Sequence, residues 1–265
     1  MARIDRREGR QLFGYDPASY DLARPGHPEQ VYEILETRCG LRRDTRILEV
    51  GPGTGQATRR LLGREDALVL VEPNVRLADH LEKTLGDEVA VLRSALEQAL
   101  LPRESFDLAV AASSFHWVDE AAGLAAIHAA LRPGGWAALW WTLFGEGSAP
   151  DAFICATTPL LEGLDSSPTK GTSGRPAHAL DVDARVAALQ AAGFVDVEHE
   201  LVRWEASWDA AGIRALYGSF SPILRLEEGE RARLLDEIEH IATRDFGGRV
   251  QRVLTTSLYT ARKPT

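Results

Sequence analysis

The sequence has little of what marks several classes of protein. Its two cysteines, Cys39 and Cys155, stand 116 residues apart with no second Cys or His at metal-binding spacing, so neither a disulfide framework nor a zinc site is indicated. The most apolar stretch, residues 136–144, is far shorter than the roughly 18 residues of a membrane span. No apolar segment follows the charged N-terminus. These absences predict a cytoplasmic protein with no membrane partner and no bound metal.

Basic charge is also scarce. The chain of 265 residues has 30 basic against 39 acidic side chains, a net charge of −9, and no polybasic run. Because such a surface repels a phosphate backbone, nucleic acid is not expected as a partner. The composition, 45% apolar and 26% charged, is that of a globular domain whose core is large enough to stand alone. We expect one main domain with a modest cap, as a monomer or a homodimer.

Short β-rich runs alternate with helical segments from residue 46 onward. This alternation is typical of βαβ crossovers and predicts an α/β fold: a seven-stranded, mostly parallel sheet with helices on both faces. The predicted strands are residues 46–50, 67–71, 89–92, 106–111, 135–141, 195–204 and 250–261, the last as an edge hairpin with the one before it. The predicted helices are residues 56–62, 74–85, 120–131 and 182–192.

Other segments fall outside this pattern. Residues 1–44, with helical signal at 28–39, are predicted to form an N-terminal helical lid. Residues 209–244 are predicted to be a helical cap insertion with two helices, and the loop-rich residues 146–181 are expected beside it. The core is then residues 45–208 and 245–265. Insertions beside the carboxyl ends of parallel strands commonly carry substrate contacts.

The most informative motif is a glycine-rich loop, EVGPGTG at residues 49–55, directly between a predicted strand and a predicted helix. Its glycines lack the Cβ atoms that would obstruct a tight turn or a close ligand. A dinucleotide-binding loop has the pattern GxGxxG, but here the third glycine comes one residue early, and no phosphate-binding GxxxxGK[ST] motif is present. The acid Glu49 suits a ligand with a cationic end better than a diphosphate.

Glu72 stands at the end of the next predicted strand. A carboxylate in that place can accept hydrogen bonds from both hydroxyls of a ribose, and an adenosine ligand supplies such a diol. The alternative is an acid that only favours the start of the following helix.

Together these motifs resemble the class I S-adenosylmethionine-dependent methyltransferases, in particular the small-molecule branch that includes trans-aconitate-type enzymes. The matching stretches are ILEVGPGTG (47–55), LVEP (70–73), SFDLAVAASSFHWVD (105–119), LRPGG (131–135) and YDLARPGHP (20–28). The resemblance implies a Rossmann-like core, S-adenosyl-L-methionine as the cofactor, and methyl transfer to a small-molecule substrate, with a carboxylate or a hydroxyl as the expected acceptor.

The resemblance also implies roles for single residues. Glu49, Gly51 and Gly53 would surround the methionine end of the cofactor, and Glu72 would hold the ribose. Where family members often have an Asp for the adenine amino group, this chain has Ala95, which leaves that contact to backbone groups or to Glu97. The expected cofactor-binding residues are Tyr20, Glu49, Gly51, Gly53, Gly55, Glu72, Pro73, Ala95, Leu96, Ser113 and Phe115.

Few catalytic residues are expected, because the cofactor carries the leaving group and the enzyme supplies position and a dry site. His116, just beyond the fourth predicted strand, is the candidate catalytic residue: it would take a proton from a hydroxyl or orient a carboxylate. In the alternative it caps the next helix or packs beside Trp117. Trp117, Trp141 and Tyr217 are the expected substrate contacts, and Tyr20 and Arg24 belong to the lid.

Other functions fit less well. Base-amine methylation typically uses a D/N-P-P-Y-like loop where this chain has SSFH at 113–116, and cytosine C5 methylation needs a Cys after a Pro, which neither cysteine has. Two alternatives stay open: a non-catalytic protein that binds S-adenosylmethionine, and a nicotinamide oxidoreductase, which the glycine spacing disfavours.

Overall fold

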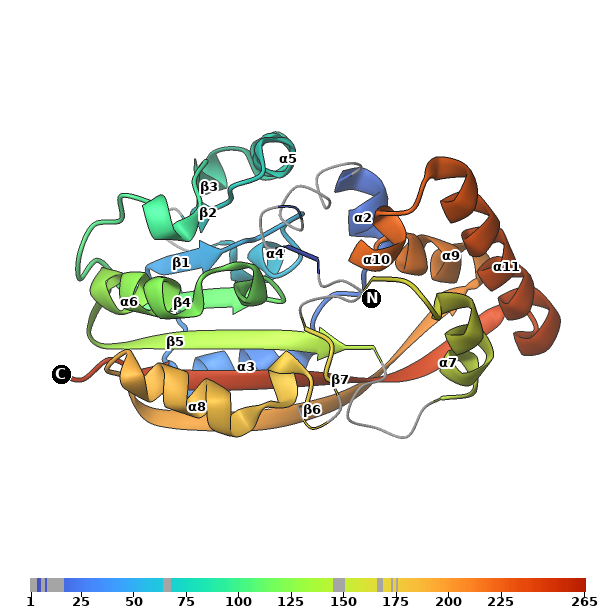
Figure 1. Cartoon of the computed structure of the whole chain (residues 1–265). Helices are drawn as coiled ribbons and strands as arrows, with labels where there is room; N and C mark the ends of the chain where they lie inside the picture. Colours follow the sequence, from blue (N-terminus) through green and yellow to red (C-terminus); the bar gives the residue numbers. More distant parts are fainter. Residues whose placement is uncertain are drawn as a thin grey trace.

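The computed structural model describes residues 4, 5, 8, 17–63, 68–144, 151–165, 169–172, 174 and 176–265. Within them, seven strands form one sheet in the order β3-β2-β1-β4-β5-β7-β6 (Figure 1). The strands are β1 (Ile47–Val50), β2 (Leu68–Val71), β3 (Val89–Leu92), β4 (Phe106–Ala112), β5 (Leu131–Leu143), β6 (Val195–Asp209) and β7 (Arg249–Arg262). This confirms the predicted seven-stranded, mostly parallel, Rossmann-like sheet.

The pairing of the strands defines where a ligand is expected. β1 is parallel to both β2 and β4, so the order of strands reverses between β1 and β4. Open α/β sheets bind ligands beside the carboxyl ends of the strands at such a reversal. β7 is antiparallel to β5 and to β6, which confirms the predicted hairpin, although β6 and not β7 forms the edge of the sheet.

Helices cover both faces of the sheet. One face packs against α3 (Glu29–Thr37), α4 (Thr58–Leu61) and α5 (Val75–Leu85), and the other against α6 (Glu120–Ala130) and α8 (Val182–Ala191). Short 3-10 helices are η1 (Gly86–Glu88), η2 (Leu96–Gln98), η3 (Phe115–Trp117), η4 (Thr158–Leu161) and η5 (His178–Leu180). Among the described residues, every helix is too short or too polar to span a bilayer.

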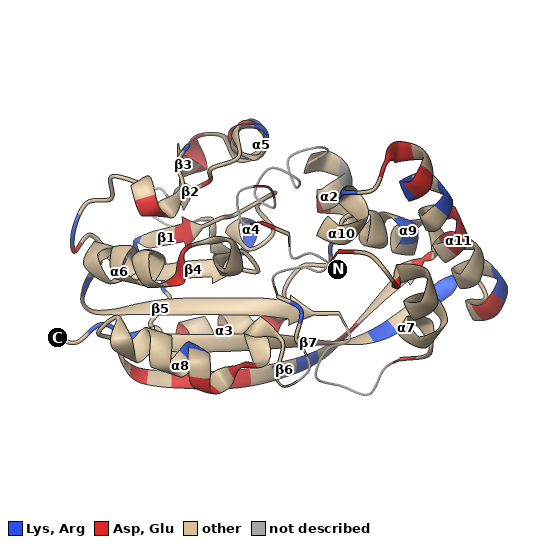
Figure 2. Cartoon of the chain, viewed as in Figure 1, with Lys and Arg blue, Asp and Glu red and all other residues tan. Residues whose placement is uncertain are grey.

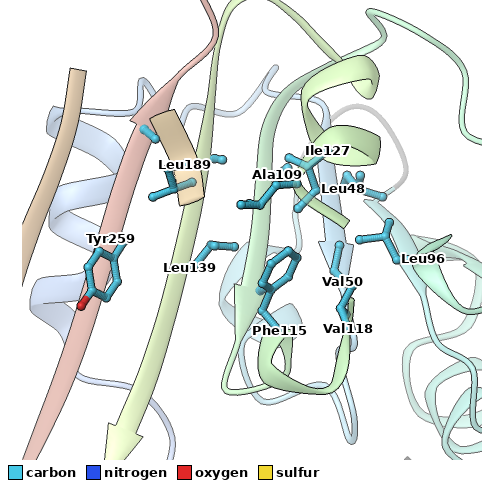
Figure 3. Packing of buried hydrophobic residues seen from close by; sticks show 14 of the residues in the cluster. Leu48, Val50, Leu96, Ala109, Phe115, Val118, Ile127, Leu139, Leu189 and Tyr259 are labelled. Atoms are coloured by element: carbon cyan, nitrogen blue, oxygen red, sulfur yellow. The ribbon is translucent and has the colours of Figure 1, made fainter. Parts of the chain in front are cut away.

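The two apolar layers follow from the alternation of side chains along buried strands. In β4, Leu108 and Val110 face the layer of α3, whereas Ala109 and Ala111 face the layer of α6. Figure 3 shows Val50, Phe115 and Leu139 close together in the α6 layer. Trp140 and Trp141 are neighbours in β5 and therefore lie on opposite faces.

The segment after α6 differs from its prediction. Residues 132–135 were expected to break the helix before a strand at 135–141, but β5 begins at Leu131. Its pairing with β4 jumps from Phe106–Leu131 to Leu108–Trp136, so these residues form an irregular bulge inside the strand. Gly134 has φ +80°, a conformation that glycine adopts readily, and this lets the chain turn there without strain.

The remaining helices gather at one end of the sheet: α2 (Pro17–Ala23), α7 (Ala152–Thr157), α9 (Ala210–Gly218), α10 (Ser221–Leu224) and α11 (Glu228–Phe246) (Figure 1). Residues 209–244 were predicted to hold two helices; the structure has three, because the short extra helix α10 begins at Ser221 with Pro222 in its first turn. An apolar cluster separate from the two sheet layers joins α7, α9, α10 and α11. The lid, core and cap boundaries themselves stay predictions.

Charged residues of both signs are interspersed over these elements. Figure 2 shows acidic and basic residues interspersed along α11, whereas the basic residues of the sheet are confined to β5, β6 and β7.

Candidate cofactor and acceptor site

A cavity of about 470 Å³ lies at the carboxyl ends of β1, β2 and β4, where the strand order reverses. Its floor includes Val50, Glu72 and Ser113 from those three strand ends. The volume is within the ordinary range for small-molecule sites. The walls come from the segment that follows α2, from the end of β5 and from the cap helix α10. The predicted glycine loop and the predicted lid therefore line the same space.

The glycine loop is shaped by close contacts. Gly51 has φ +63°, and a Cβ there would lie 2.6 Å from the Cβ of Ser114. The Ser114 hydroxyl donates a hydrogen bond to the Val50 carbonyl at 2.5 Å, which fixes Ser114 against the loop. Gly53 has φ +61° with open space around it. Glycine is thus required at both positions for the backbone, and at Gly51 also for space.

Glu72 connects this loop to the next strand. Its carboxylate accepts hydrogen bonds from the Gly53 backbone N–H at 3.3 Å and from the Asn74 backbone N–H at 2.8 Å. A carboxylate oxygen can accept more than one hydrogen bond, so a group of this kind at the cavity floor suits the two hydroxyls of a ribose. The Asn74 side chain, which accepts from two backbone N–H groups of α5, is the helix cap. Because Glu72 also accepts from the backbone N–H of this capping residue, its role at the start of α5 stays open beside the predicted ribose role.

Glu49 lies directly beneath the loop and is fully buried. Burial raises its pKa to about 7, and the nearby Glu72 carboxylate adds to the rise. Within hydrogen-bonding distance, neither Glu49 oxygen has a partner among the described residues, and the same holds for the Thr54 and Tyr32 hydroxyls. A buried carboxyl without a donor holds its proton unless a cation comes near.

The far side of the cavity is more apolar. Ala95 and Leu96, at the start of η2, line it together with Pro73 and Val118. Glu97, the suggested partner for an adenine amino group, is not part of the lining, and its Oε1 accepts from the Asp119 backbone N–H at 2.8 Å. The apolar surface suits the flat face of a base.

His116 and two tryptophans line the other end of the cavity. The Trp141 Nε1–H donates to His116 Nδ1 at 3.1 Å, and the His116 and Trp117 rings lie 4.6 Å apart. Ser113, just before them, has φ +58°, an uncommon conformation for a residue with a side chain. Its Oγ accepts from the Thr142 backbone N–H at 3.4 Å. Backbone strain of this kind is common at functional sites.

Helix α2 and the residue that follows it are held against the segment just after the glycine loop. Asp21 accepts two hydrogen bonds from Arg59, and the Gln56 side chain donates to the Arg24 carbonyl at 3.0 Å. The Arg24 guanidinium bonds to the Ser219 hydroxyl at 2.7 Å and lies 4.8–5.2 Å from the rings of Tyr20, Phe144 and Phe220. This arginine links the N-terminal segment to the cap, where α2 lies beside α9 and α10 (Figure 1).

Most predicted site residues meet at this cavity, but four do not line it. Glu49 is beneath the loop, Gly55 packs toward Leu81, and Phe115 belongs to the α6 layer of the core. Tyr217 lies in the cap cluster, where its hydroxyl bonds to Thr157 at 3.0 Å. The lining residues from the predicted set are Tyr20, Gly51, Gly53, Glu72, Pro73, Ala95, Leu96, Ser113, His116, Trp117 and Trp141.

Sequence reasoning missed several lining residues. Ser114 follows the predicted Ser113, and His27 belongs to the 20–28 motif, so both could have been predicted from the sequence. His27 is buried, which lowers its pKa to about 4, and its ring meets Trp140 edge-on at 5.5 Å. Other missed lining residues come from distant segments: Thr142, Phe144, Leu161, Leu164, Asp165, Thr169, Lys170, Phe220, Pro222 and Ile223. In the described part of the chain no group of His, Cys, Asp and Glu is arranged to hold a metal.

Comparison with known proteins agrees with this geometry. Residues 48–139 match the methyltransferase domain family. An uncharacterized methyltransferase of Schizosaccharomyces pombe is 28% identical over 233 residues, 87% of this chain and 87% of that protein. One of Mycobacterium bovis is 34% identical over 141 residues, 53% of this chain and 56% of that protein.

A solved structure described as a type II methyltransferase, from Anaeromyxobacter dehalogenans, has the same fold. The TM-score is 0.64 at 20% identity, over 91% of this chain and 99% of that one. These matches identify the protein as a methyltransferase that uses S-adenosylmethionine as its cofactor.

Proposed function

We propose that the protein transfers the methyl group to a small molecule, and that a carboxylate or a hydroxyl of that molecule is the acceptor. The observation that carries this proposal is the shape of the cavity. It is one space of about 470 Å³, lined by the glycine loop at one end and by the N-terminal segment and α10 at the other. A macromolecular acceptor would need a more open approach to the methyl group.

We infer that the cofactor lies along the loop. Gly51 and Gly53 allow its close approach, Glu72 accepts from the ribose, and Ala95 and Leu96 contact the base. When bound, the cofactor supplies an electrophilic methyl group on a positively charged sulfur. The aromatic rings of Trp117 and Trp141 face this region, exclude water and favour a nearby cation.

The acceptor end is rich in hydrogen-bond donors. Arg24 lines this end. Among the described residues, its guanidinium contacts the hydroxyl and the carbonyl of Ser219 and three aromatic rings, but no carboxylate. The hydroxyl of Ser221 lines the same end, among the apolar Phe220 and Ile223. A small acid or hydroxylated compound with an apolar body complements this surface.

The finer family placement is also a proposal. The stretch 20–28 resembles the N-terminal segment of trans-aconitate-type enzymes, and four of its residues, Tyr20, Arg24, Pro25 and His27, line the cavity. We infer that the protein belongs to this small-molecule branch and acts in the cytoplasm as a monomer or a homodimer.

The test is methyl transfer from labelled S-adenosylmethionine to a panel of small carboxylic acids, hydroxylated compounds, amines, and a ribosomal RNA and protein fraction. We expect label in one or a few small acids or hydroxylated compounds. Label only in the RNA or protein fraction would overturn the proposal. The Glu72→Gln variant, which keeps the shape of the side chain, controls for transfer that does not depend on this site.

A further inference from the structure

The hydrogen bond between Trp141 and His116 fixes where the hydrogen of the histidine lies. An indole N–H is a donor only, so His116 Nδ1, 3.1 Å away, must present a lone pair to it. A neutral imidazole carries one hydrogen, and with Nδ1 as the acceptor that hydrogen is on Nε2. The imidazole is thus in the Nε2–H tautomer, set by a contact inside the protein.

The two residues that make this bond belong to rigid parts of the fold. Trp141 is 4% exposed and packs edge-on against Tyr259 at 6.1 Å and His178 at 5.3 Å. His116 is in η3, whose turn is closed by a backbone bond from Val118 to Phe115 at 3.0 Å. Neither residue belongs to the predicted lid or the predicted cap insertion, so the bond is made within the core.

This tautomer limits what His116 can do. A general base needs a lone pair on the nitrogen that faces the reacting proton, and Nε2 carries a hydrogen instead. If His116 gained a second proton at Nδ1, that N–H would point at the N–H of Trp141. We propose that His116 acts as a hydrogen-bond donor that orients the acceptor molecule and not as a general base, and that Trp141 is the positioning residue that holds it in this form.

The inference rests on the proposed function and narrows it. The reacting atom of the acceptor must already have a free lone pair, as an ionised or unprotonated atom does. His116 then has no proton to remove. That lone pair forms the bond to the methyl carbon, and the carbon–sulfur bond breaks with its electron pair going to sulfur. No proton moves through His116 in this step. Acceptors that must lose a proton to a base are expected to react poorly.

The direct test needs no acceptor. Long-range ¹H–¹⁵N spectra of the full chain, labelled with ¹⁵N-histidine and bound to S-adenosylhomocysteine, report the tautomer of each histidine. His116→Gln assigns the signal. We expect a protonated Nε2 and an unprotonated Nδ1 at pH 7. A hydrogen on Nδ1, or on both nitrogens, would overturn the inference.

Two variants test the positioning role. Trp141→Phe should give a mixture of both tautomers, because it removes the donor and keeps a ring, whereas Trp136→Phe in the same strand should leave the spectrum of His116 unchanged. If Trp141→Phe leaves the single tautomer intact, Trp141 does not position His116.

Measurements of activity distinguish a hydrogen-bond donor from a general base at His116. The side-chain amide introduced by His116→Gln offers an N–H near the place of Nε2 but cannot accept a proton at pH 7. With the acceptor that gives most label in the transfer panel, we expect kcat within about tenfold of wild type, the size of one hydrogen bond, whereas loss of a base costs about 10²–10⁴-fold. A loss of about 10²-fold or more would refute the donor role. Absence of transfer by the wild type would instead refute the proposed function, while the tautomer remains measurable.

Discussion

Glu49→Gln should make the cofactor-free protein more stable at alkaline pH. Glu49 is fully buried, and burial raises its pKa to about 7 from an ordinary value of 4.5. Because the folded chain holds this proton more tightly than the unfolded chain, the stabilisation is fully present below pH 4.5 and is lost as the pH rises through about 7. The difference of about 2.5 pKa units corresponds to roughly 3 kcal/mol.

The assay is urea unfolding at pH 5 and pH 8.5, at one ionic strength and without cofactor. The free energy of unfolding of wild type should fall between these pH values by roughly 3 kcal/mol more than that of Glu49→Gln. Gln is neutral and similar in shape, so the two proteins should have similar stability at pH 5. At pH 8.5 the variant should be the more stable one.

Glu36→Gln is the matched control, because Glu36 is exposed on α3 and its substitution should leave the pH dependence of wild type unchanged. Equal pH dependence of wild type and Glu49→Gln would refute the reasoning. It would mean that water or a donor satisfies the Glu49 carboxylate in the free protein. Lower stability of Glu49→Gln at pH 8.5 would refute it as well.

Three other predictions concern the cavity. Glu72→Gln should weaken S-adenosylhomocysteine binding about 10–100-fold in calorimetry, since a charge-assisted hydrogen bond is worth about 1.5–3 kcal/mol; unchanged affinity would contradict the ribose role. Gly51→Ala should lower the unfolding midpoint more than Gly40→Ala, because both have positive φ but only Gly51 also has a neighbour at 2.6 Å; equal losses would show that the contact is unimportant. Arg24→Ala should lower the affinity for S-adenosylhomocysteine by several-fold, because hydrogen bonds and ring contacts are lost, while the free energy of unfolding in urea changes by only about 1–2 kcal/mol. Unchanged binding would exclude a lid role.

The parts of the fold that local patterns specify were predictable. The buried parallel strand β2 is a short apolar run, and α5 begins at a capping Asn and ends at a glycine with positive φ. The start of β5 was not predictable, because residues 132–135 have the composition of a turn and enter the strand only through pairing with β4. Similarly, α10 is a single turn that depends on the packing of the cap.

The site was predictable where one motif builds it. The loop at 49–55 and Glu72 come together because neighbouring parallel strands end at the same edge of the sheet. The bond between Trp141 and His116 was not, since it depends on the register in which Ala112 pairs with Trp140. Tyr217 shares an apolar stripe with Ile213 and Leu216 at helical spacing, a pattern that favours the core over a cavity.

The most direct measurement of the central claim is a calorimetric titration of the cofactor-free protein with S-adenosylhomocysteine, with NAD as a parallel titrant. The account predicts one site per chain for S-adenosylhomocysteine, lost when the glycine loop is altered by Gly51→Ala, and no heat with NAD. Binding of NAD, or no binding of S-adenosylhomocysteine by a folded wild-type protein, would contradict it.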